Sequence, residues 1–182
     1  MVALNKTQLA TPVGQMVLVE QGGVLVSMAF GHRWHWHLEV LQRDFGEISW
    51  QAGGSKNRTF IERYFAGDLE GLLEVQWSLK GTSFQESVWR ALATIEPNRT
   101  VSYLQLARQI GRPRAVRAVA NAVGANRLAI VLPCHRVIGS DGKLTGFAAG
   151  LDKKRWLLAH ETLDERVSTG IAMQHDNSTH QL

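Results

Sequence analysis

Cysteine is almost absent from this chain of 182 residues, because Cys134 is the only one. A single cysteine excludes an internal disulfide, and it also excludes the metal sites that are built from several cysteines. We therefore expect no disulfide and no metal ion. The isolated thiol is then either a packed core residue or a reactive nucleophile, and the residues around it must decide between the two.

Long apolar segments are absent as well. No run reaches the roughly 18 apolar residues that a membrane span needs, and the chain does not open with the charged-then-apolar pattern of a signal peptide. These absences predict no membrane association. Together with one unpaired thiol, they predict a protein of the reducing cytoplasm.

Acidic residues are missing from one long stretch. Between Pro97 and Ser140 there is no Asp or Glu, whereas seven of the 20 basic residues lie there. These seven are Arg99, Arg108, Arg112, Arg114, Arg117, Arg127 and Arg136. Such a segment is typical of a surface that binds a phosphate backbone, the alternative being an arginine-rich face exposed only to solvent.

The surroundings of Cys134 favour a reactive thiol. The apolar run 128–132 predicts a buried strand that ends at Pro133. His135 and Arg136 follow the sulfur directly, and a positive neighbourhood stabilises the nucleophilic thiolate. A buried, inert cysteine is the alternative, because free cysteines are among the most buried residues.

The first 76 residues are predicted to form one α/β unit. Apolar segments 16–20 and 24–30 flank Gly22 and Gly23, which predicts a hairpin. Helices are expected at 38–45 and 57–65, with a strand at 48–51. His32, His35 and His37 would place two imidazoles on one face of a strand, so a metal site is one interpretation; an aromatic and histidine-rich surface patch is the other.

The second unit, 81–163, is predicted to be mostly helical. A capping box of Ser83 and Glu86 begins a helix with apolar residues at helical spacing up to Pro97, and a second box at Ser102 begins a helix that runs to about residue 110. Gly111 ends that helix, and the next is expected over 114–123 with Pro113 at its first position. The pair is typical of a helix-turn-helix.

The helix at 114–123 combines arginines with small residues. Arg114 and Arg117 lie on neighbouring turns of one face, beside Ala115, Ala118 and Ala122. A face of this kind fits the narrow minor groove better than the base edges of the major groove. The alternative is an alanine-rich helix that is buried against the core.

A loop and a last helix follow the cysteine. Residues 144–150 form a glycine- and alanine-rich loop that gives a planar ligand access to backbone groups. The next helix is expected at 152–160, so that Glu161 lies at its end, where the helix dipole disfavours an acid. The polar tail 164–182 is predicted to be mobile.

Taken in order, these motifs resemble the methylated-DNA–protein-cysteine methyltransferases, also called O6-alkylguanine-DNA alkyltransferases. The resemblance covers residues 81–161, and residues 64–67 resemble the family's N-terminal domain loosely. It rests on residues 81–85, 88–89, 102–103, 110–113, 117–119, 126, 133–138, 157–158 and 161. It implies an α+β fold, with a ribonuclease-H-like N-terminal domain and a winged-helix-like domain that carries the helix-turn-helix.

The resemblance also implies catalytic roles. Cys134 would accept the alkyl group, while His135, through a water, and Glu161 behind it would relay the thiol proton. Asn126 would brace the turn before the active site, and Tyr103 would lie beside the rotated nucleotide. No cofactor is implied.

Further implied roles concern DNA and the pocket. Arg117 would fill the gap that a flipped base leaves in the duplex. Main-chain groups of Cys134 and Val137 would hold the guanine, and Phe147 and Ala148 would close the pocket. The residues expected to contact DNA are Ser102, Arg112, Arg114, Arg117, Ala118 and Arg136.

The implied reaction is a single, stoichiometric repair of O6-alkylguanine in double-stranded DNA by a monomer, with O4-alkylthymine as a further substrate. The chain departs from the family pattern at Ala120, Arg127, Phe147 and Ala149. Two other functions compete. One is a non-enzymatic winged-helix DNA-binding regulator in which Cys134 is structural; the other is a cysteine hydrolase that uses Cys134 and His135.

Overall fold

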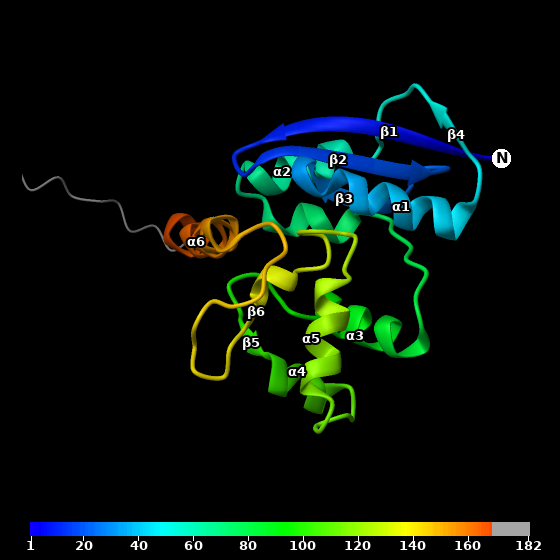
Figure 1. The fold of residues 1–182 in the computed structure, drawn as a ribbon. Coiled ribbons are helices and arrows are strands. Elements are labelled where there is room, and N and C mark those ends of the chain that lie inside the picture. The colour runs from blue at the N-terminus through cyan, green and yellow to red at the C-terminus, as the bar shows by residue number, and fades with distance from the viewer. Residues whose placement is uncertain (169–182) are drawn as a thin grey trace, which may run out of the picture.

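The computed structural model describes residues 1–168, which form a mixed α+β fold (Figure 1). The predicted α+β class is therefore confirmed. The N-terminal half contains β1 (Val2–Thr11), β2 (Gly14–Gln21), β3 (Val24–Phe30), α1 (Trp34–Phe45), β4 (Ile48–Gln51) and α2 (Arg58–Phe65). The C-terminal half contains α3 (Ser83–Ala93), β5 (Val101–Ser102), α4 (Tyr103–Gln109), α5 (Val116–Gly124), β6 (Val137–Ile138) and α6 (Leu151–Ser168). Short 3-10 turns lie at Gly31–Arg33, Leu69–Glu74 and Cys134–Arg136.

The larger sheet has the strand order β3-β2-β1-β4, with β4 parallel to β1 and the other neighbours antiparallel. The hairpin predicted around Gly22 and Gly23 is confirmed, and both glycines have positive φ. The sequence analysis missed β1, in which only Leu4 and Leu9 are buried, so that the strand carries a weak apolar pattern. β2 is central and has five consecutive buried residues from Met16, because both faces of the sheet are covered.

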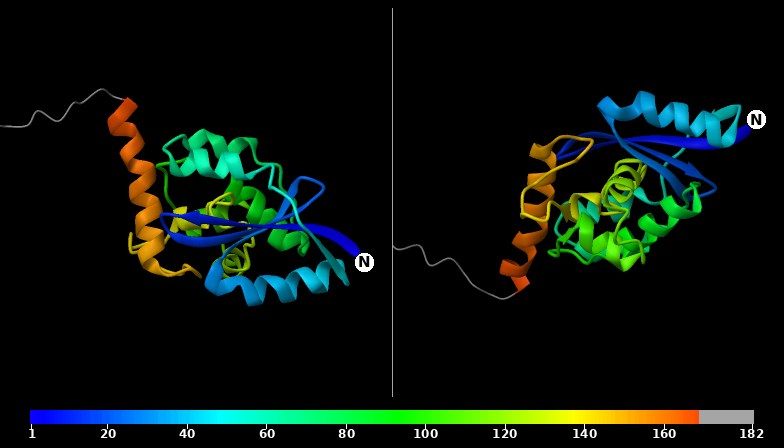
Figure 2. Two further views of the ribbon diagram at one scale, coloured as in Figure 1. Left: turned by 90° about the horizontal axis from the view of Figure 1, so that it is seen from above. Right: turned by 60° about the horizontal axis from the view of Figure 1, so that its bottom comes forward.

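Two apolar clusters use the two faces of this sheet. Val17 and Val19 pack with Leu41 of α1 on one face. Met16 and Leu18, which alternate with them along β2, belong to a larger cluster that extends through α2 into α3, α5 and α6. The two halves of the chain thus share one continuous core, and α6 lies along its side (Figure 2).

Helix boundaries in the C-terminal half differ from the predictions in three places. The first capping box uses Thr82 and Gln85 rather than Ser83 and Glu86, and α3 already ends at Ala93. The second box, Ser102 with Gln105, is confirmed, and Gly111 follows α4 with a φ of +69°. α5 begins at Val116 rather than residue 114, so Pro113 lies in the turn and not in the helix.

Three predictions around the cysteine and the C-terminus are wrong. The run 128–132 is a buried turn rather than a strand, because Leu132 N–H bonds back to Leu128 O at 2.8 Å and Ile130 has a φ of +74°. Cys134 lies in a 3-10 turn, so extended-strand geometry does not apply to it and His135. α6 continues to Ser168, which places residues 164–168 of the supposed mobile tail in a helix; residues 169–182 lie outside the described part of the chain.

Among residues 1–168, no helix has the length and apolar character that crossing a bilayer demands.

Candidate active site

Cys134 is buried, with 9% of its surface exposed, and its N–H donates to Leu132 O at 2.7 Å. Burial raises the pKa of its thiol, and this effect outweighs the opposing influence of the Asn126 side chain and of the charge on Lys154. The expectation that His135 and Arg136 would favour the thiolate is therefore wrong. The charge of Arg136 is directed at a carboxylate instead, so the resting form of Cys134 is the neutral thiol.

His135 and Glu161 form a fully buried pair, with His135 Nε2 2.7 Å from Glu161 Oε1. Because a carboxylate only accepts hydrogen bonds, Nε2 carries the proton and Nδ1 keeps its lone pair. That Nδ1 is the one buried side-chain polar atom without a partner among the described residues. Burial lowers the pKa of His135, although Glu161 opposes this effect, so the imidazole is neutral and available as a base.

Glu161 is held by three side chains. Besides His135, Tyr64 Oη donates to Oε1 at 2.9 Å, and Arg136 donates to both oxygens, at 2.8 and 2.9 Å. Burial alone would raise the pKa of Glu161, but the hydrogen bonds from His135 and Arg136 and the charge of Arg136 hold it at about 2. Glu161 lies inside α6, not at its end, so the expected conflict with the helix dipole does not exist.

Asn126 spans the turn that leads to Cys134. Its Nδ2 donates to Leu132 O at 2.9 Å, and its Oδ1 accepts from Leu128 N at 2.9 Å. Tyr103 donates to Gly146 O at 3.2 Å, and its pKa is raised by burial and by the nearby Cys134.

Lys154 is a site residue that the sequence analysis did not identify. It is fully buried, and its Nζ donates to Val137 O and Thr145 O at 2.5 and 2.6 Å. Burial lowers its pKa, and Cys134 opposes that shift. The carbonyl of Val137, one of the groups expected to hold guanine, thus already accepts one hydrogen bond. A lysine within a helical pattern has no sequence signal that separates it from a solvated one.

A small cavity of about 40 Å³ lies beside Cys134. Its lining includes Phe147 and Ala148, as expected, but neither Tyr103 nor Val137. The N-terminal half contributes the other wall. These residues, which the sequence analysis did not connect with the site, are Phe30, Arg33, Trp36 and His37. Phe30 meets Phe147 edge to face, with the ring centroids 6.1 Å apart.

Known proteins resemble this chain over most of its length. A family model described as the DNA-binding domain of 6-O-methylguanine DNA methyltransferase matches residues 83–163. The methylated-DNA–protein-cysteine methyltransferase of Haemophilus influenzae is 35% identical over 168 residues, which cover 90% of this chain and 89% of that protein. The chain belongs to the methylated-DNA–protein-cysteine methyltransferase family.

Two further relatives illustrate the family. The Methanosarcina barkeri methyltransferase is 52% identical over 101 residues, which cover 56% of this chain and 63% of that protein, less than two thirds of its length. The crystal structure of Mycobacterium tuberculosis OGT in complex with DNA superposes with a TM-score of 0.74 at 36% identity, covering 90% of this chain and 94% of that one.

The arginines of the acid-free segment separate into two groups in this member of the methyltransferase family. Five are exposed and make no ion pair within residues 1–162: Arg99, Arg108, Arg112, Arg114 and Arg117. Arg127 and Arg136 are buried, with 3% and 5% of their surfaces exposed. The expectation that Arg136 contacts DNA is therefore wrong, because its guanidinium binds Glu161 inside the protein.

On α5, Arg117 and Ala118 face solvent, while Val119, Ala122 and Val123 face the core. This excludes a fully buried helix, although Ala122 does not belong to the exposed face as expected. Ser102 is the N-cap of α4 and is half-buried.

The N-terminal histidines do not form the expected pair on a strand. His32 lies in a 3-10 turn, and His35 and His37 lie in α1. His35 is exposed beside Glu39, whereas His37 is buried and 2.7 Å from Ser27 Oγ. No group of three or more metal-ligating side chains occurs in the described part of the chain. The surface-patch interpretation holds for the exposed His32 and His35 but not for the buried His37.

Proposed function

We propose that this protein repairs DNA by transferring an alkyl group from O6 of guanine to Sγ of Cys134. The observation that carries this proposal is a buried thiol beside a neutral imidazole whose orientation is set by a buried carboxylate. In this family member, as in other sites with a nucleophile, a base and an orienting group, such an arrangement activates the nucleophile at the moment of reaction.

The chemistry balances without a cofactor. The thiol proton passes through a bridging water to Nδ1 of His135, and Glu161 stabilises the resulting imidazolium. The thiolate attacks the alkyl carbon, so that an S–C bond forms while the C–O6 bond breaks, and the electron pair of that bond passes to guanine. Tyr103 donates a hydrogen bond to the leaving base, which takes up one proton from water at N1, and the imidazolium returns the thiol proton to water, so the number of protons is unchanged overall. The thioether is stable, so each molecule repairs one lesion.

Access to the lesion requires base flipping, because the alkyl carbon is not reachable within a stacked duplex. We propose that α5 enters the minor groove, with Ala118 permitting close approach and Arg117 occupying the gap in the stack. Ser102, Arg112 and Arg114 bind the backbone. Phe147, Ala148 and main-chain groups of Cys134 and Val137 enclose the flipped base, and Asn126 keeps the thiol in place. O4-alkylthymine is a further substrate.

The test is mass spectrometry after incubation with a duplex that contains O6-methylguanine. One methyl group should appear on Cys134 and on no other residue, without turnover. Cys134→Ser should retain DNA binding and transfer nothing. Multiple turnover, or methylation of another residue, contradicts the proposal.

The same measurement separates the two rival functions. A winged-helix regulator with a structural Cys134 would bind DNA without becoming methylated. A cysteine hydrolase would leave the five exposed arginines without a role, and it would show turnover on an ester or amide.

We further propose two functional units, a ribonuclease-H-like unit at 1–76 and a winged-helix-like unit at 81–163, in which α4 and α5 form the helix-turn-helix. The sheet of the first half and the α4–α5 pair support this division. We also propose that the protein acts as a monomer in the cytoplasm.

A further inference from the structure

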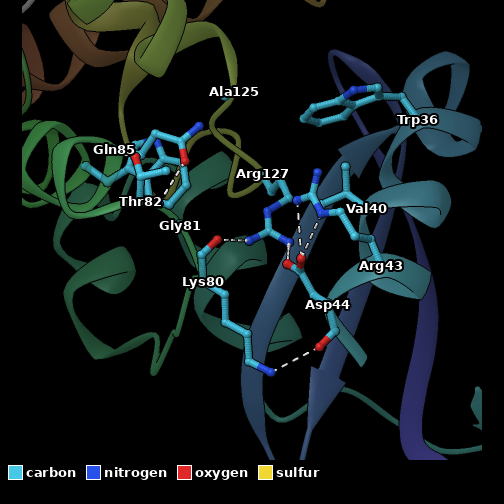
Figure 3. A pocket seen from close by; sticks show the side chains of 11 residues that line it. Trp36, Val40, Arg43, Asp44, Lys80, Gly81, Thr82, Gln85, Ala125 and Arg127 are labelled. Atoms are coloured by element: carbon cyan, nitrogen blue, oxygen red, sulfur yellow. Dashed lines mark hydrogen bonds and ion pairs between the residues drawn. The ribbon is translucent and has the colours of Figure 1, made fainter. Parts of the chain in front are cut away.

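Arg127 forms a buried ion pair between the two halves of the chain (Figure 3). Its Nη1 lies 2.5 Å from Oδ2 of Asp44 at the end of α1, and its Nη2 donates to Lys80 O at 2.6 Å. The side chains of Arg127 and Asp44 are only 4% and 9% exposed. Because removing two charges from water is costly, a pair of this kind adds little net stability compared with apolar residues. The Arg127–Asp44 pair is better explained by the way it fixes the position of residue 127 relative to α1.

The backbone of Arg127 is held as firmly as its side chain. Its carbonyl accepts from Met28 N at 2.7 Å, and Ala129 N donates to Met28 O at 3.2 Å, so the chain is paired with β3 at this point. Side chain and backbone together attach residue 127 to α1, to β3 and to the segment before α3.

The neighbouring residue, Asn126, attaches the same turn to the thiol. Its side chain donates to Leu132 O, which also accepts from Cys134 N, so Asn126 and the backbone of Cys134 share one acceptor. Asn126 is also close enough to the thiol to lower the pKa of Cys134. Two consecutive residues therefore connect the N-terminal half with Cys134. Arg127 binds α1, and Asn126 binds the turn that leads to the nucleophile.

The turn that connects Asn126 with Cys134 is strained. Ile130 has a φ of +74°, in the left-handed region that a β-branched residue rarely occupies, and it is fully buried. A strained backbone conformation persists only when several surrounding contacts hold it in place. Asn126 supplies one set of restraints from inside the turn, and Arg127 supplies the other from outside.

We propose that Arg127 is a positioning residue for the transfer reaction: its ion pair with Asp44 holds Asn126, and through it the thiol of Cys134, in reactive geometry. This inference rests on the proposed function. It gives the N-terminal half a part in the chemistry besides the cavity wall that this half contributes.

The decisive variant is Asp44→Asn, which preserves shape but leaves Arg127 without its carboxylate. Arg43→Ala is the matched control, because Arg43 contacts the same carboxylate, 3.2 Å from Oδ1, but is 70% exposed and does not touch the turn. Single-turnover transfer from O6-methylguanine duplex and DNA affinity are measured for both. We expect Asp44→Asn to slow transfer at least tenfold with DNA affinity within twofold of wild type, and Arg43→Ala to change neither.

A second readout does not depend on DNA. Cys134 is the only cysteine, so ¹³Cβ-cysteine labelling gives one resonance whose titration reports the thiol pKa directly. Asp44→Asn should raise this pKa, because a displaced Asn126 no longer lowers the pKa of the thiol. The other groups that act on it, Lys154, Tyr103 and His135, are untouched. A pair that merely joins the halves would lower the melting temperature without moving this resonance.

The outcomes are distinguishable. If wild-type protein transfers no methyl group, the proposed function fails. If folded Asp44→Asn transfers at the wild-type rate with an unchanged thiol pKa, the positioning role is overturned. Should Asp44→Asn not fold, the double variant Asp44→Leu/Arg127→Met replaces it, because it removes the ion pair without leaving either charge buried and unpaired. A wild-type rate in that variant overturns the role equally.

Discussion

Replacing Glu161 with Gln should lower the free energy of unfolding by about 3–5 kcal/mol at neutral pH. Gln preserves the shape of the side chain but removes its charge. Arg136 then remains as a buried cation whose only other partner in the described residues is the carbonyl of Ile95. Since small domains have unfolding free energies of about 5–15 kcal/mol, this is a large fraction of the total.

Tyr64→Phe is the matched control. It removes the 2.9 Å hydrogen bond to the same carboxylate and leaves both charges in place, so we expect a loss of about 1.5–3 kcal/mol at most. The double variant Glu161→Gln/Arg136→Met should be less destabilised than the sum of its single variants, because it leaves no unpaired charge.

The assay is urea denaturation, extrapolated to zero denaturant, at several pH values. The folded-state pKa of Glu161 is about 2, below its unfolded value of 4.5, so its contribution is fully present above pH 4.5 and is lost as the pH falls toward 2. The difference between wild type and Glu161→Gln should therefore disappear over this range. A loss below about 1 kcal/mol at neutral pH would show that solvent, rather than Glu161, compensates Arg136, and would refute the reasoning.

Three further predictions concern catalysis, DNA and pH. His135→Ala should slow single-turnover transfer by roughly 10²–10⁴-fold at neutral pH, and the deficit should shrink as the pH rises past the elevated pKa of Cys134; a deficit independent of pH argues against a proton relay. Arg117→Ala should slow repair of duplex DNA far more than reaction with the free alkylated base, whereas Arg90→Ala, which removes an exposed arginine beside Glu86 on α3, should affect neither; equal losses on both substrates contradict the proposed insertion. His37 has a folded-state pKa of about 3 against 6.5 unfolded, because of burial and the charges of Arg33 and Arg127, so wild-type stability should fall with decreasing pH between these values, by about 1.4 kcal/mol per pH unit inside the window; thermal unfolding of His37→Gln should show a flatter dependence.

The features that were predictable from sequence depend on near neighbours. The Gly22-Gly23 hairpin and the Ser102–Gln105 capping box each lie within a few residues, and both form as expected. The first box failed by one position because Thr82–Gln85 and Ser83–Glu86 are overlapping copies of one pattern. Local signals predict that a helix begins, but they do not choose between two adjacent starts.

Which basic side chains are buried and which are exposed was not predictable from the sequence. Arg127 meets a carboxylate 83 residues away, and Arg136 meets one 25 residues away. Lys154 bonds to backbone carbonyls that become available only after α6 packs against the turn at 134–136. In the sequence, Arg127 and Arg136 are indistinguishable from the five arginines that remain on the surface. Only the tertiary fold decides which guanidinium faces solvent and which is paired inside.

These buried pairs also explain why nearby positive charge does not ionise Cys134. Arg136 is neutralised by Glu161 and Arg127 by Asp44, so their fields largely cancel at the sulfur. Lys154 alone is bound to neutral carbonyls and acts on Cys134 without compensation, and its effect is smaller than that of burial. The protein therefore rests with a protonated thiol that is barely exposed, a form that reacts slowly with electrophiles in solution. Under the proposed mechanism, the nucleophile is generated only when His135 accepts its proton, which confines reactivity to an alkyl group brought into the cavity.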